Sequence, residues 1–446
     1  MRFLPALIGL ALATASFDAH AASVKPGDMI TPDNAALVAD LVSPGNLYLV
    51  RQGMRMKIAP TERLEWPPPY KAATEKYASQ VSLNEKGELQ NYVAGQPFPL
   101  LDPNDPQVAV KAMWNFSFRP QYTDDADIRD VEINTTGATG PMIEHLAIGH
   151  FAFYNNMGRT EVNPIPTDPE ANGANIRYRF GAFPFLDPED LRGFGLVRIR
   201  SRKPGVDDDA WYYNPTTRKL RAITADSLSD AMGPVGMGGG AGGGMPSTFT
   251  TSVSYANNLD PDSFFGFAAK VENYDYKLLG LKPMLAAVDA EHTPATPCQF
   301  DNGRSVCPEA WQLRQLYVIE AIAKPKSWHQ RIGSGGVLIP RRVLYLDSEG
   351  WFLTASDQYA ADGKLWKTVA TFNTYSDRPV RDARVAIYPF KRMFQTALVD
   401  EDIEDGTSSV VFMPGHESDE HESWYINMGI VTKAFLDPHQ MQNFAH

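Results

Sequence analysis

Cysteine is almost absent from this chain, which has only Cys298 and Cys307 among its 446 residues. In an oxidising compartment, two cysteines so close in sequence indicate a disulfide around a tight loop. A metal site at this pair would need more Cys or His nearby, and only His292 is close. We therefore predict a structural disulfide between the two cysteines and no metal there.

Long apolar runs are missing after the first residues of the chain, so no later segment is predicted to span a bilayer. The exception runs from Phe3 to Ala13, after the positive charge of Arg2 and before the small-x-small sequence at residues 19–21. This run has roughly half of the ~20 apolar residues that a membrane-spanning helix needs. It predicts a signal peptide over residues 1–21. No cysteine lies near the cleavage site, so we expect an exported, soluble protein that is not lipidated.

Positive charge is in deficit, with 41 Lys and Arg against 53 Asp and Glu and a net charge of −12 at pH 7. Binding to nucleic acid requires clustered Lys and Arg that neutralise phosphates, so the balance argues against a nucleic-acid partner. Apolar residues make up 43% of the chain, which suits a globular protein with a large core. We expect residues 22–446 to form a single large domain.

Catalytic signatures are missing as well. Residues 333–336 lack the first glycine of a Gly-x-Ser-x-Gly elbow, and the chain has neither a phosphate-binding loop nor a dinucleotide fingerprint. We therefore expect no cofactor and no catalytic residues.

Histidine and acidic residues cluster only at residues 416–422. A helical zinc site places histidines four positions apart, whereas His416 and His421 are five apart, which turns the second ring away from the first. We predict a solvated acidic loop without structural zinc, and an adventitious metal patch is the alternative.

Among the features that are present, the first is a change of character along the chain. Residues 22–170 read as a mixed part, with short helices after Thr31 and after Asp105. The proline run at residues 66–70 predicts a stiff extended connector.

From residue 175 to 446, strand patterns follow one another. Residues 176–180 and 196–200 alternate apolar and polar side chains, and the second run places Arg198 and Arg200 on one face. Short turns separate the runs at residues 211–220, 341–358 and 364–374, and such turns join antiparallel neighbours. The pattern predicts a mainly β protein of the α+β type, with one large, curved antiparallel sheet.

A glycine-rich stretch at residues 232–247 has almost no side chains to pack, so it predicts a flexible loop. It is interpreted either as a surface loop or as a lid whose methionines touch an apolar ligand.

Aromatic side chains are abundant on the predicted strands. Most of them suit an ordinary core, but a curved sheet with an apolar concave face could instead hold a hydrophobic ligand. The alternation of a strand does not tell whether its odd or its even positions face the concave side of the sheet. The candidate ligand-binding residues are Phe183, Phe185, Trp211, Tyr213, Phe265, Tyr317, Tyr345, Trp351, Trp366 and Phe372.

Several segments, taken in their order, resemble one family. They are residues 92–99, 102–103, 114–115, 187–193, 209–215, 218–221, 317–324 and 363–367. The chain resembles a proteobacterial periplasmic family of unknown function whose members are commonly labelled outer-membrane lipoprotein-sorting proteins. The glycine-rich residues 236–244 look like an insertion in that family's pattern.

The resemblance implies a half-open β-barrel like that of the lipoprotein carrier LolA and its relatives LolB and LppX, with a few helices over the concave face. It implies a periplasmic carrier of a lipid or other hydrophobic molecule, working with an inner-membrane transporter of the resistance-nodulation-division type and an outer-membrane channel. A structural adaptor of such a complex, without a small ligand, is the alternative, and an envelope hydrolase is less favoured. The family has no established catalytic residues to carry over.

Overall fold

The structure is a computed structural model that describes residues 24–138, 140, 142–206, 208–224, 267–324, 339–379, 387–416 and 424–444. Four features of the sequence analysis lie outside these residues: the signal peptide at 1–21, the glycine-rich stretch at 232–247, Phe265 and His421.

The described strands form one 16-stranded sheet and a small two-stranded one. The main path runs in the order β1 (Met29–Ile30), β2 (Met56–Ile58), β12 (Glu309–Ala323), β13 (Arg341–Asp347), β14 (Leu353–Tyr359), β15 (Leu365–Ser376), β16 (Arg392–Asp402), β17 (Thr407–Phe412), β5 (Asp125–Thr136), β6 (Met142–Asn155), β7 (Ile176–Asp187), β8 (Gly195–Ser201), β9 (Asp209–Asn214) and β10 (Lys219–Thr224). Two strands lie off this path: β11 (Tyr274–Asp289) pairs with β12 and β15, and β18 (Trp424–Ile426) pairs with β5. The small sheet pairs β3 (Ser82–Leu83) with β4 (Leu89–Gln90), as the turn between them requires.

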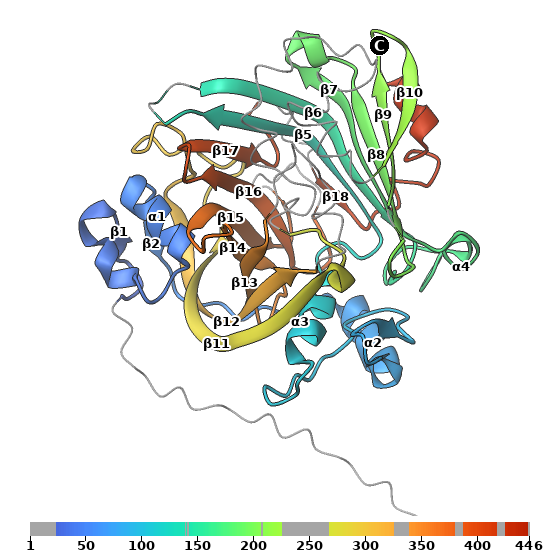
Figure 1. Cartoon of the computed structure of the whole chain (residues 1–446), viewed down its shortest axis with the longest axis horizontal. Helices are drawn as coiled ribbons and strands as arrows, with labels where there is room; N and C mark the ends of the chain where they lie inside the picture. Colours follow the sequence, from blue (N-terminus) through green and yellow to red (C-terminus); the bar gives the residue numbers. More distant parts are fainter. Residues whose placement is uncertain are drawn as a thin grey trace, which may run out of the picture.

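The large sheet curves into a partial ring with an open side (Figure 1). Its described pairings are antiparallel except for two short parallel ones, β2 with β12 and β11 with β15. The predicted fold class, a mainly β protein with a large curved sheet, is therefore confirmed.

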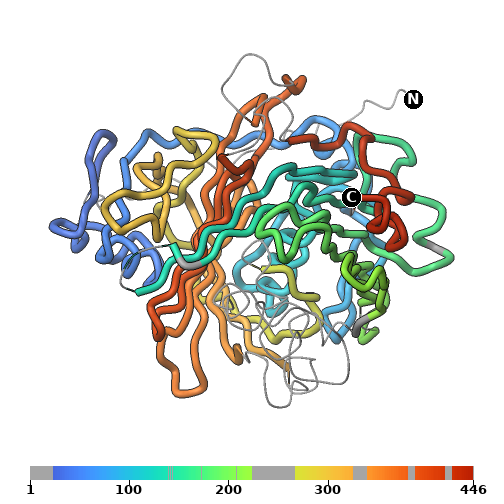
Figure 2. Tube along the Cα trace, turned by 90° about the horizontal axis from the view of Figure 1, so that it is seen from above, coloured from blue at the N-terminus to red at the C-terminus, as the bar shows by residue number. Residues whose placement is uncertain are grey.

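The sheet extends into the part of the chain before residue 175. Strands β5 and β6 lie in its middle, where β5 pairs with β17 from near the C-terminus. Figure 2 shows teal β5 and β6 crossing next to the orange-red strands near the C-terminus, of which β17 pairs with β5. The mixed N-terminal part thus supplies two of the longest strands of the sheet, which its sequence pattern did not indicate.

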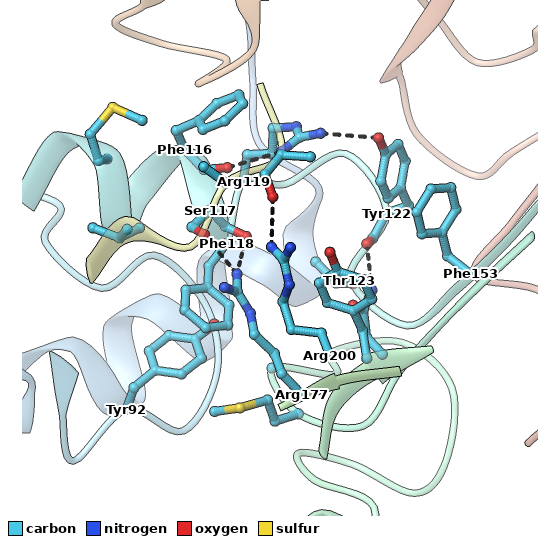
Figure 3. A pocket seen from close by; sticks show the side chains of 18 of the residues that line it. Tyr92, Phe116, Ser117, Phe118, Arg119, Tyr122, Thr123, Phe153, Arg177 and Arg200 are labelled. Atoms are coloured by element: carbon cyan, nitrogen blue, oxygen red, sulfur yellow. Dashed lines mark hydrogen bonds between the residues drawn. The ribbon is translucent and has the colours of Figure 1, made fainter. Parts of the chain in front are cut away.

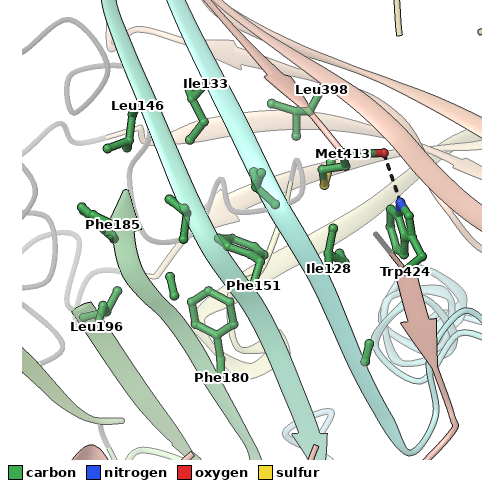
Figure 4. Packing of buried hydrophobic residues seen from close by; sticks show 14 of the residues in the cluster. Ile128, Ile133, Leu146, Phe151, Phe180, Phe185, Leu196, Leu398, Met413 and Trp424 are labelled. Carbon is green, nitrogen blue, oxygen red and sulfur yellow. Dashed lines mark hydrogen bonds between the residues drawn. The ribbon is translucent and has the colours of Figure 1, made fainter. Parts of the chain in front are cut away.

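The two faces of the sheet carry separate apolar cores. On the concave face, a cluster that includes Ile128, Phe151, Phe180 and Leu398 packs across β5 to β8 and β16 (Figure 4). We call it the concave cluster. On the opposite face, Phe372, Ala397 and Val399 belong to another cluster with helix α1 (Pro44–Gln52). Because successive strand residues point to opposite faces, the same strands contribute to both cores.

Helices lie on both faces of the sheet. Helix α1 covers the outer face of β14 and β15, and the amide of Gly45 donates to Asp357 Oδ1 at 3.2 Å. A Cβ at Gly45 would meet Thr368 Oγ1 at 1.8 Å, so only glycine permits this close approach. Helix α3 (Val108–Ser117) packs instead against β11 to β14 on the concave side. The expected helix cover of the concave face therefore holds for α3, and α1 lies on the other face.

The proline run expected to be an extended connector is partly helical. Helix α2 (Pro68–Tyr77) begins inside it, because prolines are tolerated in the first turn, where the amide lacks a helical partner. The remaining helices are α4 (Pro169–Ala174) and the 3-10 helices η1 (Pro32–Val38), η2 (Ala78–Gln80), η3 (Glu189–Leu191), η6 (Val271–Asn273) and η8 (Pro438–Asn443).

Cys298 and Cys307 are joined by a disulfide, as the sequence predicted. Both are buried against the segment that leads into β12, and the loop that they close is further held by the Ser305 hydroxyl donating to Asp301. The disulfide thus ties down the approach to one of the longest strands.

Candidate functional site

A cavity of about 110 Å³ lies on the concave side, at the open side of the ring. One wall is the end of helix α3, and the other is formed by β6, β7 and β8 (Figure 3). Residues 267–271 complete the lining. The cavity therefore lies between the end of helix α3 and the β6–β8 part of the curved sheet.

Helix α3 is held at this position by its own polar side chains. Asn115 Nδ2 donates to the carbonyl oxygen of Phe98 at 2.7 Å, and the Phe98 amide donates back to Asn115 Oδ1 at 2.8 Å. Trp114 Nε1 donates to the carbonyl oxygen of Gly87 at 2.9 Å. Trp114, Asn115 and Phe98 lie in segments that carry the family resemblance, and Tyr92 from the same segments lines the cavity. These segments therefore build the cavity's helical wall.

Aromatic side chains make the cavity continuous with the apolar cores. Tyr122, Phe153 and Tyr178 line it and also pack against the concave cluster. Phe116 and Phe267 line it from the α3 side, where they belong to the neighbouring core. An apolar ligand in the cavity would thus contact rings from the sheet and from helix α3.

Arg177, at the start of β7, reaches across to the end of helix α3. Its Nη2 donates to the carbonyl oxygen of Ser117 at 2.9 Å and to Ser117 Oγ at 2.7 Å. Its guanidinium lies 4.4 Å from the centre of the Phe118 ring. Free carbonyls and the negative end of the helix dipole attract a cation at this position. Burial lowers the pKa of Arg177, and Arg200 lowers it further, whereas nearby Tyr178 raises it.

Arg119, directly after α3, turns back over the same end of the helix. Its Nη1 donates to the carbonyl oxygen of Phe116 at 3.1 Å, its Nε to Gln121 Oε1 at 2.9 Å, and its Nη2 to the Tyr122 hydroxyl at 3.0 Å. All three acceptors are neutral. Among the described residues, neither Arg119 nor Arg177 has a carboxylate oxygen within 4.0 Å.

Arg200 connects the cavity to a buried ion cluster. Its Nη1 donates to the carbonyl oxygen of Ala268 at 2.6 Å, and its Nε donates to Asp208 at 2.9 Å. Asp208 also forms ion pairs with Arg198 at 2.6 Å and with Lys270 at 3.2 Å. Burial alone would raise the pKa of Asp208, but Arg200, Arg198 and Lys270 outweigh it and hold the pKa well below its usual range.

Among the residues that the structure describes, cations therefore outnumber the carboxylates that they contact around the cavity. We call Arg119, Arg177, Arg198, Arg200 and Lys270, together with Asp208, the arginine junction. In the described part of the chain, Asp208 is the carboxylate that contacts these cations, and Glu272 acts on Arg177 and Lys270 only from a greater distance. Such a site can bind a negatively charged group beside apolar surface.

The predicted aromatic residues are distributed over several cores, and none of the described ones lines this cavity. Phe185 belongs to the concave cluster. Tyr317 and Trp351 stack 5.4 Å apart in the core beneath α3. Tyr345 and Phe372 point to the outer face, and Trp366 is half-buried.

Phe183, Trp211 and Tyr213 form a further cluster on the outer side of β7 to β9. The C-terminal segment with Leu436 and Met441 covers them. Phe183 and Phe185 lie in different clusters although they are two positions apart. The strict alternation on which the sequence interpretation depended therefore does not hold for these two rings.

The sequence analysis missed the arginines of the cavity. Its usable signal was the alternation of Arg177 and Arg179 on one strand and Arg198 and Arg200 on the next. Regular alternation predicts a solvated face, but β7 and β8 shift register between Ile176 and Tyr178. Arg177 and Tyr178 consequently both line the cavity, although neighbours in a regular strand point to opposite faces.

His416 forms an ion pair and no metal site is formed by the described residues. Its Nδ1 lies 3.0 Å from Glu132 Oε2, and its amide donates to the same oxygen at 2.8 Å. The hydrogen bond to Glu132 raises the pKa of His416. The rest of the acidic stretch, including His421, lies outside the described residues.

Fold and site together define a class: a half-open β-sheet protein with a cavity, lined by aromatic rings and arginines, between helix α3 and strands β6 to β8. The chain belongs to the family described as "Protein of unknown function (DUF1329)", whose model matches residues 29–239 and 247–419. The break between the two matched ranges falls inside the glycine-rich stretch. No curated protein matches this chain.

Three solved structures are similar to the chain at low identity. A domain from Vibrio parahaemolyticus labelled as outer membrane lipoprotein-sorting is 12% identical, with a TM-score of 0.42, over 75% of this chain and 98% of that domain. A DUF1329 family protein from Desulfovibrio piger is 14% identical, with a TM-score of 0.39, over 72% and 92%. A LolA superfamily protein from Nitrosomonas europaea is 12% identical, with a TM-score of 0.31, over 71% and 90%. In the described part of this chain, no helix is long and apolar enough to cross a membrane.

Proposed function

We propose that this protein is a periplasmic carrier that binds a lipid or another hydrophobic molecule. The observation that carries the proposal is the cavity on the concave side, whose rings Tyr122, Phe153 and Tyr178 continue into the concave cluster. The signal-peptide pattern at residues 1–21 supports export to the periplasm. The proposal includes no catalytic step.

The physics of transfer favours a carrier of this kind. Removing one methylene from water gains about 0.8 kcal/mol, so a short stretch of apolar wall retains a hydrocarbon chain without any polar motif. Typical pockets for complete small molecules enclose about 300–1,000 Å³. A cavity of about 110 Å³ therefore suits one end of a ligand, with the remainder lying against the aromatic rings at its rim.

We further propose that the carrier exchanges its ligand with an inner-membrane transporter of the resistance-nodulation-division type and with an outer-membrane channel. This part rests on the family resemblance of the sequence. A structural adaptor in the same complex would need no ligand, so ligand binding separates the two functions.

The test is a titration of the exported chain, purified from the periplasm of a Gram-negative host and delipidated, with the fluorescent fatty acid cis-parinaric acid. We expect saturable binding. The variant Phe153→Asp puts a charge against the apolar wall, where it costs binding free energy, and should bind weakly. The matched control is Phe300→Asp, because Phe300 is exposed and lies far from the cavity lining.

Circular dichroism confirms that each variant folds. If the parent binds neither this probe nor any lipid extracted with it from the periplasm, the adaptor function replaces the carrier function. If folded Phe153→Asp binds as the parent does, the ligand lies elsewhere on the protein.

A further inference from the structure

We infer that the cavity recognises the anionic headgroup, a carboxylate or a phosphate, of an amphipathic ligand, and that Arg119 and Arg177 contact it. This inference rests on the proposed carrier function and deepens it by naming the ligand class. It concerns a protein whose overall charge is −12, so a positive cavity is a local property of the fold.

The first argument is the state of the two guanidinium groups. Arg177 uses one of its nitrogens, Nη2, for the two bonds to Ser117 in the described structure. Arg119 is bound to a carbonyl, an amide and a hydroxyl, all of which are neutral. A planar guanidinium matches the two oxygens of a carboxylate or phosphate, and the bonds shorten and strengthen when the acceptor carries charge.

The second argument is the local charge. Asp208 is shared by Arg198, Arg200 and Lys270, and among the described residues no carboxylate oxygen lies within 4.0 Å of Arg119 or Arg177. Desolvation penalises a cation without a counter-charge, and burial is the largest influence on the pKa of Arg177, which it lowers. A ligand anion would remove this penalty.

The third argument is the shape of the site. Arg119, Arg177 and Arg200 line the cavity together, and Phe153 stacks on Tyr122, whose hydroxyl accepts from Arg119 Nη2 at 3.0 Å (Figure 3). A volume of about 110 Å³ is large enough for a headgroup but not for a whole lipid. An amphipathic acid would place its charge among these guanidinium groups and its chain against Phe153, which continues into the concave cluster.

The competing explanation is purely structural. In that case Arg119 and Arg177 only cap the carbonyls at the end of α3, and the cavity has no preference for anions. The two explanations differ in ligand selectivity, which is measurable on the parent protein without any variant.

The experiment compares palmitic acid with methyl palmitate, which has the same chain but no charge, by displacement of a neutral fluorescent probe, an ester of cis-parinaric acid. Dodecyl phosphate and dodecanol form a second matched pair, and inorganic phosphate and acetate test the headgroup alone. We expect each charged amphiphile to bind about 10- to 100-fold more tightly than its neutral partner, because hydrogen bonds to charged groups are worth that much. We expect the free anions to compete only weakly.

Two variants, Arg177→Gln and Arg119→Gln, keep hydrogen-bond donors but remove the charge. Each should reduce the preference for the acid over the ester while leaving the affinity for the ester nearly unchanged. The matched control is Arg192→Gln at the far end of the same β7–β8 hairpin, where the side chain is 57% exposed and pairs with Glu189. Arg192→Gln should keep the full preference.

The outcomes separate the two proposals. If the parent binds acid and ester equally, the headgroup inference is overturned and the carrier function stands. If it binds neither the neutral probe nor any amphiphile, the carrier function itself fails. If inorganic phosphate or acetate binds as tightly as the long-chain acids, the cavity takes a small free anion and not a lipid headgroup. If the folded arginine variants keep the preference of the parent, the anion is bound elsewhere.

Discussion

Around the cavity, the described cations outnumber the carboxylates that they contact, whereas three buried cations beside β12 to β17 each pair with a buried carboxylate. In the second region Arg314 pairs with Asp347, Arg304 with Glu401, and Lys367 with Asp402 at 2.7 Å. We call these three pairs and Asp357 the acidic region. The same chain thus has one region with an excess of buried cations and another in which buried cations and carboxylates are paired.

The pKa values shift in opposite directions in the two regions. At the arginine junction, surrounding cations hold the pKa of Asp208 well below its usual range. In the acidic region, burial raises the pKa of Asp357 to about 6 and that of Glu401 to about 7. Net charge is therefore a poor guide to the potential inside a cavity, because desolvation and near neighbours dominate there.

The largest loss of stability is expected for Asp208→Asn, which changes the charge balance of the arginine junction. It leaves Arg198, Arg200 and Lys270 buried without the carboxylate that they share. Removing one partner of a buried ion pair costs about 3–5 kcal/mol, and we expect a loss of this size in the free energy of unfolding by urea at pH 7. Asp362→Asn is the control, because Asp362 pairs with Lys364 on an exposed turn and should leave the unfolding midpoint unchanged. A loss for Asp208→Asn as small as that of the control would show that the junction does not depend on this carboxylate.

The next largest loss of stability is expected for Arg304→Gln, and it should depend on pH. This variant removes the cation beside buried Glu401. The folded pKa of Glu401, about 7, lies above its unfolded value of 4.5, so in the parent this group costs stability progressively as the pH rises from about 4.5 to about 7. Without Arg304 the folded pKa rises further. The variant should therefore be close to the parent at pH 5 and less stable by about 1 kcal/mol at pH 8, because each pH unit above the parent's folded pKa adds at most about 1.4 kcal/mol.

Urea unfolding at both pH values measures this difference. Arg63→Gln, which breaks a pair whose side chains are 72% and 66% exposed, serves as the matched control and should show no difference between the two pH values. An Arg304→Gln variant that loses equal stability at pH 5 and pH 8 would contradict the role given to Glu401.

The smallest effect is expected at His416→Gln, in a half-exposed pair that belongs to neither region. The folded pKa of His416 is raised above 6.5, so its contribution is complete below pH 6.5 and is lost as the pH rises through the folded pKa. The folded pKa of its partner Glu132 is lowered from 4.5 to about 2, so that contribution is present above pH 4.5 and is lost as the pH falls through about 2. The parent should exceed the variant most between pH 4.5 and 6.5.

Solvent screening limits this difference to less than about 1 kcal/mol, because 38% of the His416 side chain is exposed. Thermal unfolding of parent and variant at pH 5.5 and pH 9 checks it. A larger gap at pH 9 than at pH 5.5 would contradict the assignment of the ion pair.

Strand alternation predicted β7, β8 and the hairpins of the second half, because one face of each is apolar. It did not indicate β5, whose sequence begins with Asp125, Ala126 and Asp127. Asp125 is buried there because its carboxylate accepts the amides of Gly429 at 3.0 Å and Ile430 at 3.1 Å. No local pattern shows that a distant segment will supply these donors.

The sequence alone determined the mainly β class, the disulfide between Cys298 and Cys307, and the excess of negative charge, since these depend on local periodicity, on chemistry and on composition. Only the tertiary structure decided that Arg119, Arg177 and Arg200 would line one cavity. These arginines come from a loop and two strands, and a register shift in β7 turns Arg177 inward. Because desolvation and the distances between distant charges exist only in the folded chain, a protein of net charge −12 can hold a positive cavity.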